Sequence, residues 1–527
     1  MQEEDYISLA PGKTWWDIVS RHARDYPDRI ALAYEDEHMS YAELAASVDQ
    51  CTQQFAALGV SSGNCIAVLA PPRPEAMITF FAAARLGAVW VGLNPRYRIR
   101  ELAYVIGHAK PTLVVSVKGF EERDYVSDVQ AAMVEAADTA LPCTTIFFDG
   151  NDRAPDTLHA ALNQAGGATS SVFAPTPIEP SEPAMLVYTS GTTGNPKGVL
   201  LSQEALIFRS TVQAHTFAVQ SHPVVINFAP INHIGGMHFR GLSQILAAGT
   251  IVYQDRYRTS EVTPLIQRHG VNMLMLGSTM MQMLLRDPTF DISILRKMEW
   301  FIFSGAAIPM PILQKISHYC PKIGSTYGLT ESCGSVSYIV DSDSLESAAY
   351  TIGLAVPEGQ LRVADESGTT LAAGQTGELQ VRKRYCMSEY LHDPKATASA
   401  LTDDGWLKTG DTALMQEDGR FKLVGRIKEM YKSGGYNVYP REIEVILEQH
   451  PDVVMAAVIS VDDELYQQVG HAYVISQPGS TLNDGDLKEW CKSRLANYKV
   501  PKRIEIRTSL PMLSIGKVDK LALRSSI

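Results

Sequence analysis

A chain of 527 residues is longer than one hydrophobic core usually supports, so we expect more than one domain. Apolar residues make up 45% of the chain and charged residues 20%, which is ordinary for a soluble globular protein. The formal net charge of −12 argues against nucleic acid as a partner, because nucleic-acid binding favours a basic face. The most apolar segment, residues 76–93, is interrupted by Arg85 and two glycines, so we expect no transmembrane segment.

The seven cysteines favour a reducing compartment. Their number is odd and no two of them have Cys-x-x-Cys spacing, which argues against a disulfide frame or a zinc site. The first five residues are acidic and precede no apolar run, so a signal peptide is not expected. The last residues do not form a Ser-Lys-Leu peroxisomal signal. These features together predict a cytoplasmic protein.

Helices and strands alternate from residue 14 to about residue 115. Helices are expected from Trp15 and over residues 41–58 and 75–86, and continuous apolar strands over residues 65–70 and 88–92. Ser40 and Glu43 form a capping box at the start of the second helix, and Gly59 is expected to end it. Alternation of this kind predicts a parallel sheet with helices on both faces.

Residues 188–199 contain three glycines, three threonines, one serine and Lys197. An apolar strand is expected before them, over residues 184–187, and a helix is expected to begin with residues 200–201 and to continue through residues 205–207. Glycine lets backbone N–H groups turn inward, so this composition suits a concave anion site. It is not a Walker loop, because Pro196 precedes the lysine and Gly198 follows it. Composition alone is equally consistent with a turn that binds nothing.

His233 follows an expected strand at residues 224–228, and the two glycines shortly after it, Gly235 and Gly236, are expected to leave space. A histidine satisfied within a turn is the simplest interpretation from the residues alone. His238 and Arg240 are candidates for contact with a polar substrate tail, and a structural role suits them equally well. Methionines concentrate in residues 271–283, where they indicate either core packing or a pliable acyl pocket beside Gly277 and Ser278.

An apolar strand at residues 300–303 leads into small residues at 304–307, and open α/β sheets bind ligands at such strand ends. In the later block 324–331, Tyr327 can stack on a purine, Thr330 can donate to a phosphate, and Glu331 can bind a hard cation. A short β meander is expected over residues 360–381. Asp411 follows a Thr-Gly turn. Beyond residue 427, strands and helices predict a small α+β module.

Six motifs in order resemble those of the adenylate-forming superfamily, which includes acyl-CoA synthetases, luciferases and peptide-synthetase adenylation domains. They are residues 188–199, 229–237, 324–331, 406–411, 425–444 and 510–517. The resemblance implies an α/β fold with a large N-terminal domain, in which parallel-rich sheets are covered by helices and joined by a β-rich subdomain. A small mobile α+β C-terminal domain follows. The implied boundaries are 1–427 for the ATP- and carboxylate-binding domain and 428–527 for the domain with the catalytic lysine.

The same resemblance implies which residues bind the nucleotide and magnesium. Asp411 and Arg426 would bind the ribose, and Glu331 would hold Mg²⁺. The remaining nucleotide contacts would come from Thr189, Ser190, Gly191, Thr192, Thr193, Gly194, Lys197, Gly305, Ala306, Ala307, Thr326, Tyr327 and Gly328.

It also implies the catalytic residues and the acid pocket. Lys517, with Thr330 and Glu331, would serve adenylation, Lys432 would serve thioester formation, and Lys428 would be the hinge. Lys520 stands where the family commonly has arginine. The carboxylic acid would lie against His233, in a pocket lined by Gly235, Gly236, Gly277, Ser278 and Ser304.

The implied activity is that of an AMP-forming acyl-CoA synthetase that uses ATP, Mg²⁺ and coenzyme A. Amino-acid-specific relatives pair the substrate ammonium with an aspartate after the histidine motif. Residues 230–246 contain no Asp or Glu, so an aryl, alicyclic or fatty acid without an α-amino group is expected. The chain ends ten residues after Lys517, so no fused carrier domain is expected. A ligase that loads a separate carrier protein, and a non-catalytic nucleotide-binding protein of the same fold, remain alternatives. A homodimer is compatible with the sequence.

Overall fold

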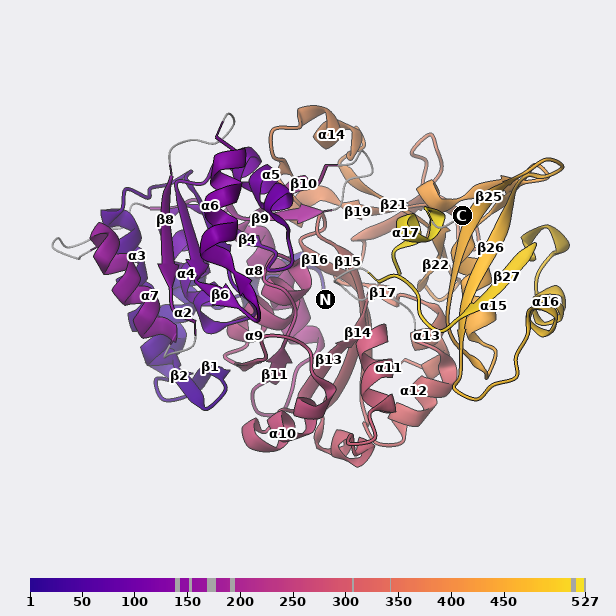
Figure 1. The fold of residues 1–527 in the computed structure, drawn as a ribbon, viewed down its shortest axis with the longest axis horizontal. Coiled ribbons are helices and arrows are strands. Elements are labelled where there is room, and N and C mark those ends of the chain that lie inside the picture. Colours follow the sequence, from indigo (N-terminus) through magenta and orange to yellow (C-terminus); the bar gives the residue numbers. More distant parts are fainter. Residues whose placement is uncertain are drawn as a thin grey trace.

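The computed structural model describes residues 1–137, 143–150, 154–167, 177–189, 195–305, 308–341, 343–512 and 518–525. Two large sheets, whose strands alternate along the chain, are joined to a four-stranded sheet and a C-terminal module (Figure 1). The predicted α/β class, with a large N-terminal part rich in parallel strands, is confirmed. Among the described residues, none of the helices is both long and apolar enough to cross a membrane.

The seven-stranded sheet has the order β20-β10-β9-β4-β3-β5-β8. The strands from β9 to β8 are parallel, whereas β10 and β20 are antiparallel to their neighbours. Their bounds are β3 (Cys65–Leu69), β4 (Val89–Leu93), β5 (Leu113–Val117), β8 (Thr144–Phe148), β9 (Pro183–Thr189), β10 (Lys197–Ser202) and β20 (Glu389–Tyr390).

The nine-stranded sheet has the order β17-β16-β15-β14-β13-β11-β12-β1-β2 and is parallel from β15 to β1. Only its edge strands at both ends run antiparallel to their neighbours. Its strands are β1 (Ile30–Tyr34), β2 (Glu37–Ser40), β11 (Val224–Asn227), β12 (Thr250–Tyr253), β13 (Met273–Gly277), β14 (Trp300–Ser304), β15 (Ile323–Leu329), β16 (Gly334–Ile339) and β17 (Leu354–Ala355).

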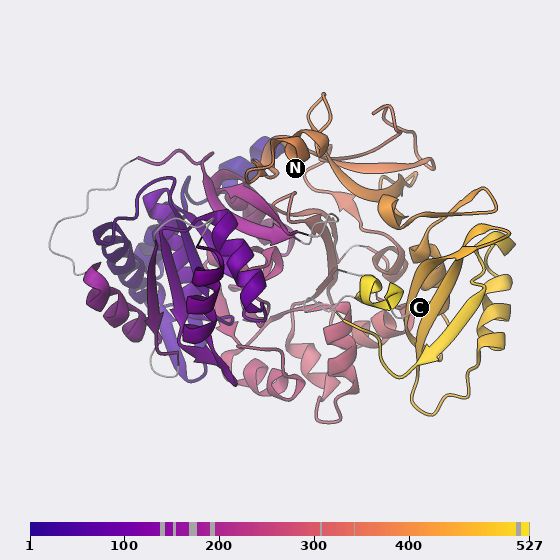
Figure 2. The same cartoon turned by 45° about the horizontal axis from the view of Figure 1, so that its top comes forward.

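Helices α4 (Pro74–Leu86) and α8 (Gln203–Thr216) lie between the two large sheets, because each contacts strands of both (Figure 2). A helix enclosed in this way must be buried all round. Twelve residues of α4 are buried, including both phenylalanines. One continuous hydrophobic cluster therefore joins the two sheets through these helices. A second cluster covers the other face of the nine-stranded sheet.

The remaining helices of the large part cover the outer faces and edges of these sheets. They are α1 (Glu3–Leu9), α2 (Trp15–Asp25), α3 (Tyr41–Ala57), α5 (Ile99–Ala109), α6 (Tyr125–Glu135), α7 (Ala154–Leu162), α9 (Ser243–Leu246), α10 (Thr259–His269), α11 (Ser278–Arg286), α12 (Met310–Ser317), α13 (Leu345–Tyr350) and α14 (Pro394–Ser399). The predicted capping box of α3 is present, since Glu43 and Ser40 exchange hydrogen bonds, and Gly59 has a φ of 87° just beyond the helix.

Two local predictions are wrong. Residues 200–201 belong to strand β10 and not to a helix, which begins only at Gln203. The predicted anion loop is therefore the connection of an antiparallel hairpin, in which Thr189 pairs with Lys197. Asp411 lies within strand β21 (Trp406–Met415) and not after a turn. The Thr-Gly pair before it forms a kink inside that strand, with a φ of 71° at Gly410.

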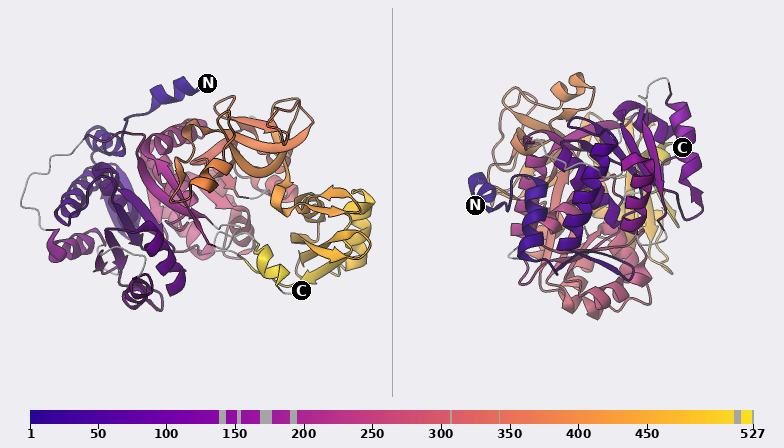
Figure 3. Two further views of the ribbon diagram at one scale, coloured as in Figure 1. Left: turned by 90° about the horizontal axis from the view of Figure 1, so that it is seen from above. Right: turned by 90° about the vertical axis from the view of Figure 1, so that its left-hand side faces the viewer.

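The four-stranded sheet contains β18 (Leu361–Ala364), β19 (Thr376–Arg382), β21 and β22 (Phe421–Arg426), all antiparallel. The first two strands are the predicted meander. After β22 the chain enters the C-terminal module, whose five strands are β23 (Tyr431–Ser433), β24 (Tyr436–Val438), β25 (Val453–Asp463), β26 (Gln467–Ser476) and β27 (Arg503–Arg507). Helices α15 (Pro440–Glu448), α16 (Asp484–Lys492) and α17 (Lys520–Arg524) pack with this sheet (Figure 3).

Lys520 is the centre of a buried ion cluster in this module. Its Nζ lies 2.6 Å from Oε2 of Glu429 and 2.8 Å from Oε1 of Glu444. Burial lowers the pKa of Lys520, but the two carboxylates more than offset this effect, and the pKa is raised above its ordinary value. The lysine therefore fixes α17, which follows the predicted catalytic loop, to α15 and to the segment directly after the predicted hinge.

Replacing Lys520 with methionine should destabilise the C-terminal module. The change removes one of the two cations beside buried Glu444 and leaves Arg441, so we expect a loss of about 1.5–3 kcal/mol, as for a hydrogen bond to a charged group. The matched control is Lys488→Met, which removes an exposed pair with Asp484 and should cost less than about 1 kcal/mol. Urea unfolding followed by hydrogen exchange in α15 and β25 measures both effects. Equal stability of the two variants would contradict the structural role of Lys520.

Candidate active site

Three predicted site residues form a row across the nine-stranded sheet. Gly277, Ser304 and Thr326 are paired neighbours on β13, β14 and β15, and the first two end their strands. These strands are parallel, so their carboxyl ends meet at one edge, where open α/β sheets bind ligands. Gly305 follows with a φ of 87°, which turns the chain away from the sheet. Predicted acid-pocket and nucleotide-binding residues thus share this edge.

Asp411 links this edge to the four-stranded sheet. Its Oδ2 accepts a 2.6 Å hydrogen bond from the hydroxyl of Tyr327, and its Oδ1 lies 3.0 Å from Nε of Arg426. Burial and the neighbouring Asp411 raise the pKa of Tyr327 well above its ordinary value, so the phenol stays protonated and donates. Arg426 is half-exposed and pairs with Asp411 across β21 and β22. All three residues were predicted to bind the nucleoside.

Glu331 and Lys197 are brought together by a residue that the sequence did not reveal. The hydroxyl of Tyr390 donates a 3.0 Å hydrogen bond to Oε1 of Glu331, and Nζ of Lys197 lies 4.7 Å from the centre of the Tyr390 ring. Tyr390 reaches both because β20 pairs with β10. It belongs to none of the sequence motifs, and only this long-range strand pairing identifies it.

The donor set near Glu331 fits a magnesium ion shared with phosphates. Among the described residues, no group of three His, Cys, Asp or Glu side chains could hold a metal ion by itself. Mg²⁺ commonly binds through one or two carboxylates together with substrate phosphates and waters. Glu331 is the predicted carboxylate, and one of its oxygens is oriented by Tyr390. Thr330 is buried beside it in the turn after β15.

The His233 segment is a tight turn that leads into the π-helical segment η2 (Gly235–Leu242). Nδ1 of His233 accepts a 3.0 Å hydrogen bond from the backbone N–H of Gly235. In the neutral ring the proton is therefore on Nε2, which can donate to a carboxylate. The expectation that both glycines leave space is wrong for Gly236. A Cβ there would lie 2.4 Å from the carbonyl oxygen of Pro230, so this glycine is needed for close packing.

Gly277 does leave space. A Cβ on this residue would meet no atom within 4 Å among its described neighbours. Ser278 begins α11 directly after it and is buried. Of the methionines nearby, Met273, Met275 and Met281 are buried, whereas Met283 is half-exposed. Most of this methionine cluster is thus core packing, and the open position is at the end of β13.

Some predicted residues cannot be placed. Residues 190–194, residues 306–307 and Lys517 lie outside the described residues, so their predicted roles have no structural account. Gly328 is described, and a Cβ there would lie 2.0 Å from the carbonyl oxygen of Gly334, so it serves close packing of β15 on β16. In the C-terminal module, Lys428 lies in the short helix η5 (Ile427–Glu429), and Lys432 is exposed on β23.

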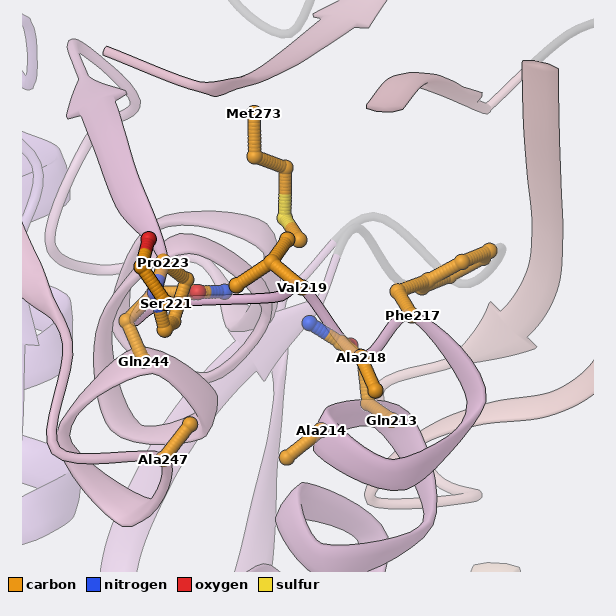
Figure 4. A pocket seen from close by; sticks show the side chains of 10 residues that line it. All are labelled: Gln213, Ala214, Phe217, Ala218, Val219, Ser221, Pro223, Gln244, Ala247 and Met273. Carbon is orange, nitrogen blue, oxygen red and sulfur yellow. The ribbon is translucent and has the colours of Figure 1, made fainter. Parts of the chain in front are cut away.

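A cavity of about 140 Å³ lies elsewhere in the molecule (Figure 4). Its lining includes Gln213 and Phe217 from α8 and the segment after it, Gln244 from α9, and Met273. Met273 begins β13 and Gly277 ends it, a separation of about 13 Å along a strand. The cavity therefore lies at the amino-terminal ends of the strands, away from the edge where the predicted site residues gather.

Comparison with known proteins defines the family. The AMP-binding enzyme family matches residues 19–391, and the AMP-binding enzyme C-terminal domain matches residues 442–517. The indoleacetate–CoA ligase of Aromatoleum aromaticum is 30% identical over 95% of this chain and 96% of its own length. The sulfoacetate–CoA ligase of Cupriavidus necator is also 30% identical, over 96% of each chain. This chain belongs to the AMP-binding enzyme family and is of the acyl-CoA synthetase type.

Solved structures agree with this assignment. MatB from Rhodopseudomonas palustris is 27% identical, and the similarity covers 97% of this chain and 98% of that chain. The TM-score is 0.86 against its ATP-bound structure and 0.79 against its apo structure. The arrangement of this chain is thus more similar to the ATP-bound form.

Two glycine substitutions separate packing from pocket space. Gly236→Ala places a methyl group against two backbone carbonyls that cannot move aside, so we expect a loss of about 1–3 kcal/mol of stability and a lower Tm. Gly277→Ala meets open space and should leave Tm within about 2 °C of the wild type, since its backbone φ is not positive. Calorimetry of both variants measures the difference, and a similar loss in both would contradict the open position at Gly277.

Proposed function

We propose that the protein activates a carboxylic acid with ATP and transfers the acyl group to coenzyme A. In the first step a carboxylate oxygen attacks the α-phosphorus of ATP, which forms acyl-AMP and releases pyrophosphate. In the second step the thiol of coenzyme A attacks the acyl carbonyl, which forms the thioester and releases AMP. The observation that carries the proposal is the row Gly277–Ser304–Thr326, where acid-pocket and nucleotide-binding candidates lie side by side.

The described residues suit the first step. Tyr327, Asp411 and Arg426 form a connected surface for the adenosine, and each oxygen of Asp411 keeps a second lone pair that could accept from a ribose hydroxyl. Glu331 would hold magnesium on the phosphates, and Thr330 would donate to them. His233 would donate from Nε2 to the acid. These fixed donors stabilise charge that develops during the transfer, at no cost of reorganisation.

The second step requires a different position of the C-terminal module. By the resemblance, Lys517 serves adenylation and Lys432 serves thioester formation, and both belong to residues 428–527. A rotation of this module at Lys428 would bring each lysine to the same site in turn. The higher similarity to the ATP-bound MatB structure supports an adenylation-type arrangement in the present structure. The proposed setting for this chemistry is the cytoplasm.

The proposed acid has no α-ammonium group. The segment after His233 has no carboxylate to pair with such a cation. The relatives act on indoleacetate and sulfoacetate, and these acids share only the acetic carboxyl group. The relatives therefore support formation of an acyl-CoA but do not identify the rest of the acid. The side chains of the pocket decide which acid is bound.

The two lysines should divide the two half-reactions. Lys517→Ala should lower the rate of acid-dependent pyrophosphate exchange at least about 100-fold. The variant lacks a cation that would stabilise the negative charge developing during adenylation. It should still convert a supplied acyl-AMP to the thioester. Lys432→Ala should show the opposite bias. Both rates are measured on purified variants with unchanged Tm. Equal loss of both half-reactions in each variant would refute this division, and no exchange by the wild type with any acid would refute the proposed function.

Asp411 should contribute more to nucleotide binding than Tyr327. Asp411→Ala should weaken ATP binding by about 10- to 100-fold, since it removes the ribose acceptor and leaves Arg426 without its partner. Tyr327→Phe keeps the ring and loses one hydrogen bond, so a change of about 2- to 10-fold is expected. Calorimetric titration with ATP and magnesium measures both. A larger effect of Tyr327→Phe would contradict the assigned role of Asp411.

A further inference from the structure

Arg240 is a buried cation without an anionic partner. It lies in η2 and only 6% of the residue is exposed. Burial lowers the pKa of Arg240 to about 10, which leaves the guanidinium charged at neutral pH. No carboxylate of the described residues pairs with it, and the aromatic rings of Phe228 and Phe239 lie 5.1 and 5.6 Å from its Cζ. Buried charges are usually paired, because an unpaired charge is costly to desolvate.

The guanidinium of Arg240 is held in place but not saturated. Nε donates a 3.0 Å hydrogen bond to the carbonyl of Met275, and Nη1 donates one of 3.2 Å to the carbonyl of Gly235. An arginine has five N–H donors. The described residues therefore leave Nη2 without a partner. Nη2 is not among the fully enclosed unpartnered side-chain atoms of the described residues, so it keeps some accessible surface.

Arg240 is a neighbour of two residues of the candidate acid pocket, His233 and Gly235. A Cβ on Gly235 would lie 3.0 Å from Nδ1 of His233 and 3.7 Å from Nη1 of Arg240, so the two side chains are neighbours across this glycine. Met275, the other anchor of Arg240, lies two residues before Gly277 on β13. Arg240 therefore contacts the histidine turn through Gly235 and the strand that ends at Gly277 through Met275.

A second buried arginine, Arg209, lacks the accessible unpartnered nitrogen that Arg240 has. Arg209 on α8 is fully buried and donates to the carbonyl of Ser332 and to Oε1 of Gln360. Its unpartnered nitrogen, Nη1, is fully enclosed. The unpartnered nitrogen of Arg209 is thus fully enclosed, whereas that of Arg240 keeps some accessible surface next to residues of the candidate pocket.

We propose that Arg240 binds a second anionic group on the acid, so that the substrate carries a carboxylate or sulfonate in addition to the carboxyl group that is activated. The anion would accept from the free N–H groups of a guanidinium already oriented by two backbone carbonyls. Charge-assisted hydrogen bonds of this kind are short, directional and specific for planar or tetrahedral oxyanions. The inference rests on the proposed synthetase activity and specifies its substrate class.

Matched pairs of acids test the proposal without any mutation. Acetate is compared with sulfoacetate, butyrate with succinate, and phenylacetate with 4-carboxyphenylacetate, in acid-dependent pyrophosphate exchange by the full-length enzyme. We expect kcat/KM to be at least about tenfold higher for the dianionic member of at least one pair, as expected when a single charged hydrogen bond is gained. Preference for the monoanionic member in every pair would overturn the proposal.

Variants identify the residue responsible. Arg240→Gln should lower kcat/KM for the preferred dianionic acid by about 30-fold or more, mainly because KM rises. The kcat/KM for the monoanionic acid of the same pair should change by less than about threefold. Arg240→Lys should retain part of the preference for the dianionic acid, because lysine keeps the charge but lacks the planar guanidinium that can bind an oxyanion through two N–H groups. Arg209→Gln is the matched control, and it should keep the wild-type ratio within each pair even if its Tm falls.

The outcomes separate the two proposals. If Arg240→Gln reduces both members of a pair equally, Arg240 only supports the fold and the anionic site is refuted. If Arg240→Gln does not fold, the ratios measured with the wild type and with Arg240→Lys decide. Exchange with monoanionic acids alone would refute the anionic substituent while retaining the synthetase. Absence of exchange with every acid, in an enzyme that still binds ATP, would refute the synthetase activity itself.

Discussion

The hydrogen-bonded carboxylate of Asp411 is the interaction on which the candidate site depends. Its side chain is 6% exposed, and a carboxylate can be buried to this extent only if its oxygens are satisfied. Tyr327 satisfies one oxygen from the nine-stranded sheet, and Arg426 the other from the last strand before the C-terminal module. Two parts of the chain that are far apart in sequence, β15 and the β21–β22 pair, are thus fixed at one carboxylate. Loss of either partner would leave an oxygen of the Asp411 carboxylate buried and unsatisfied. This cost favours the one arrangement in which all three residues are in contact.

The C-terminal edge of the large sheet provides the second constraint. Parallel pairing sets the register of β13, β14 and β15, and this register alone places Gly277, Ser304 and Thr326 in one row. Small side chains at this edge leave room beside the backbone, whereas Tyr327 and Glu331 follow on β15 and in its turn. The acid and the nucleotide can therefore approach one another without any catalytic side chain acting as a nucleophile between them. Positioning and fixed charge are the main contributions that this edge can make.

Local patterns were sufficient for much of the fold. The capping box at Ser40, the continuous apolar strands and the largely apolar helix α4 each follow from short stretches of sequence. The short apolar run at residues 199–201 was misassigned, because such a run suits a strand or the start of a helix equally well. Its identity as β10 is decided by pairing with β9 and β20, the second of which lies nearly two hundred residues away. Tyr390 was missed for the same reason.

For the site, motifs located the polar residues but not their contacts. Composition around His233 suggested space at both glycines, yet only the backbone path shows that Gly236 is enclosed while Gly277 is open. The unpaired state of Arg240 is also invisible in sequence. It depends on the absence of carboxylates from every packed neighbour among the described residues, and this is a property of three-dimensional packing. Burial of a charge is informative only when its partners are known.

The separation of the hydrophobic cores supports the proposed rotation of the C-terminal module. Among the described residues, the two clusters of the large part include no residue beyond Leu423, and the two clusters of the module begin at Tyr431. The segment between them contains polar residues and the short helix η5. Rotation at Lys428 would therefore break no shared core. The ion cluster of Lys520, Glu429 and Glu444 lies wholly within residues 428–527, so it would move with the module and keep α17 fixed to α15 during the change.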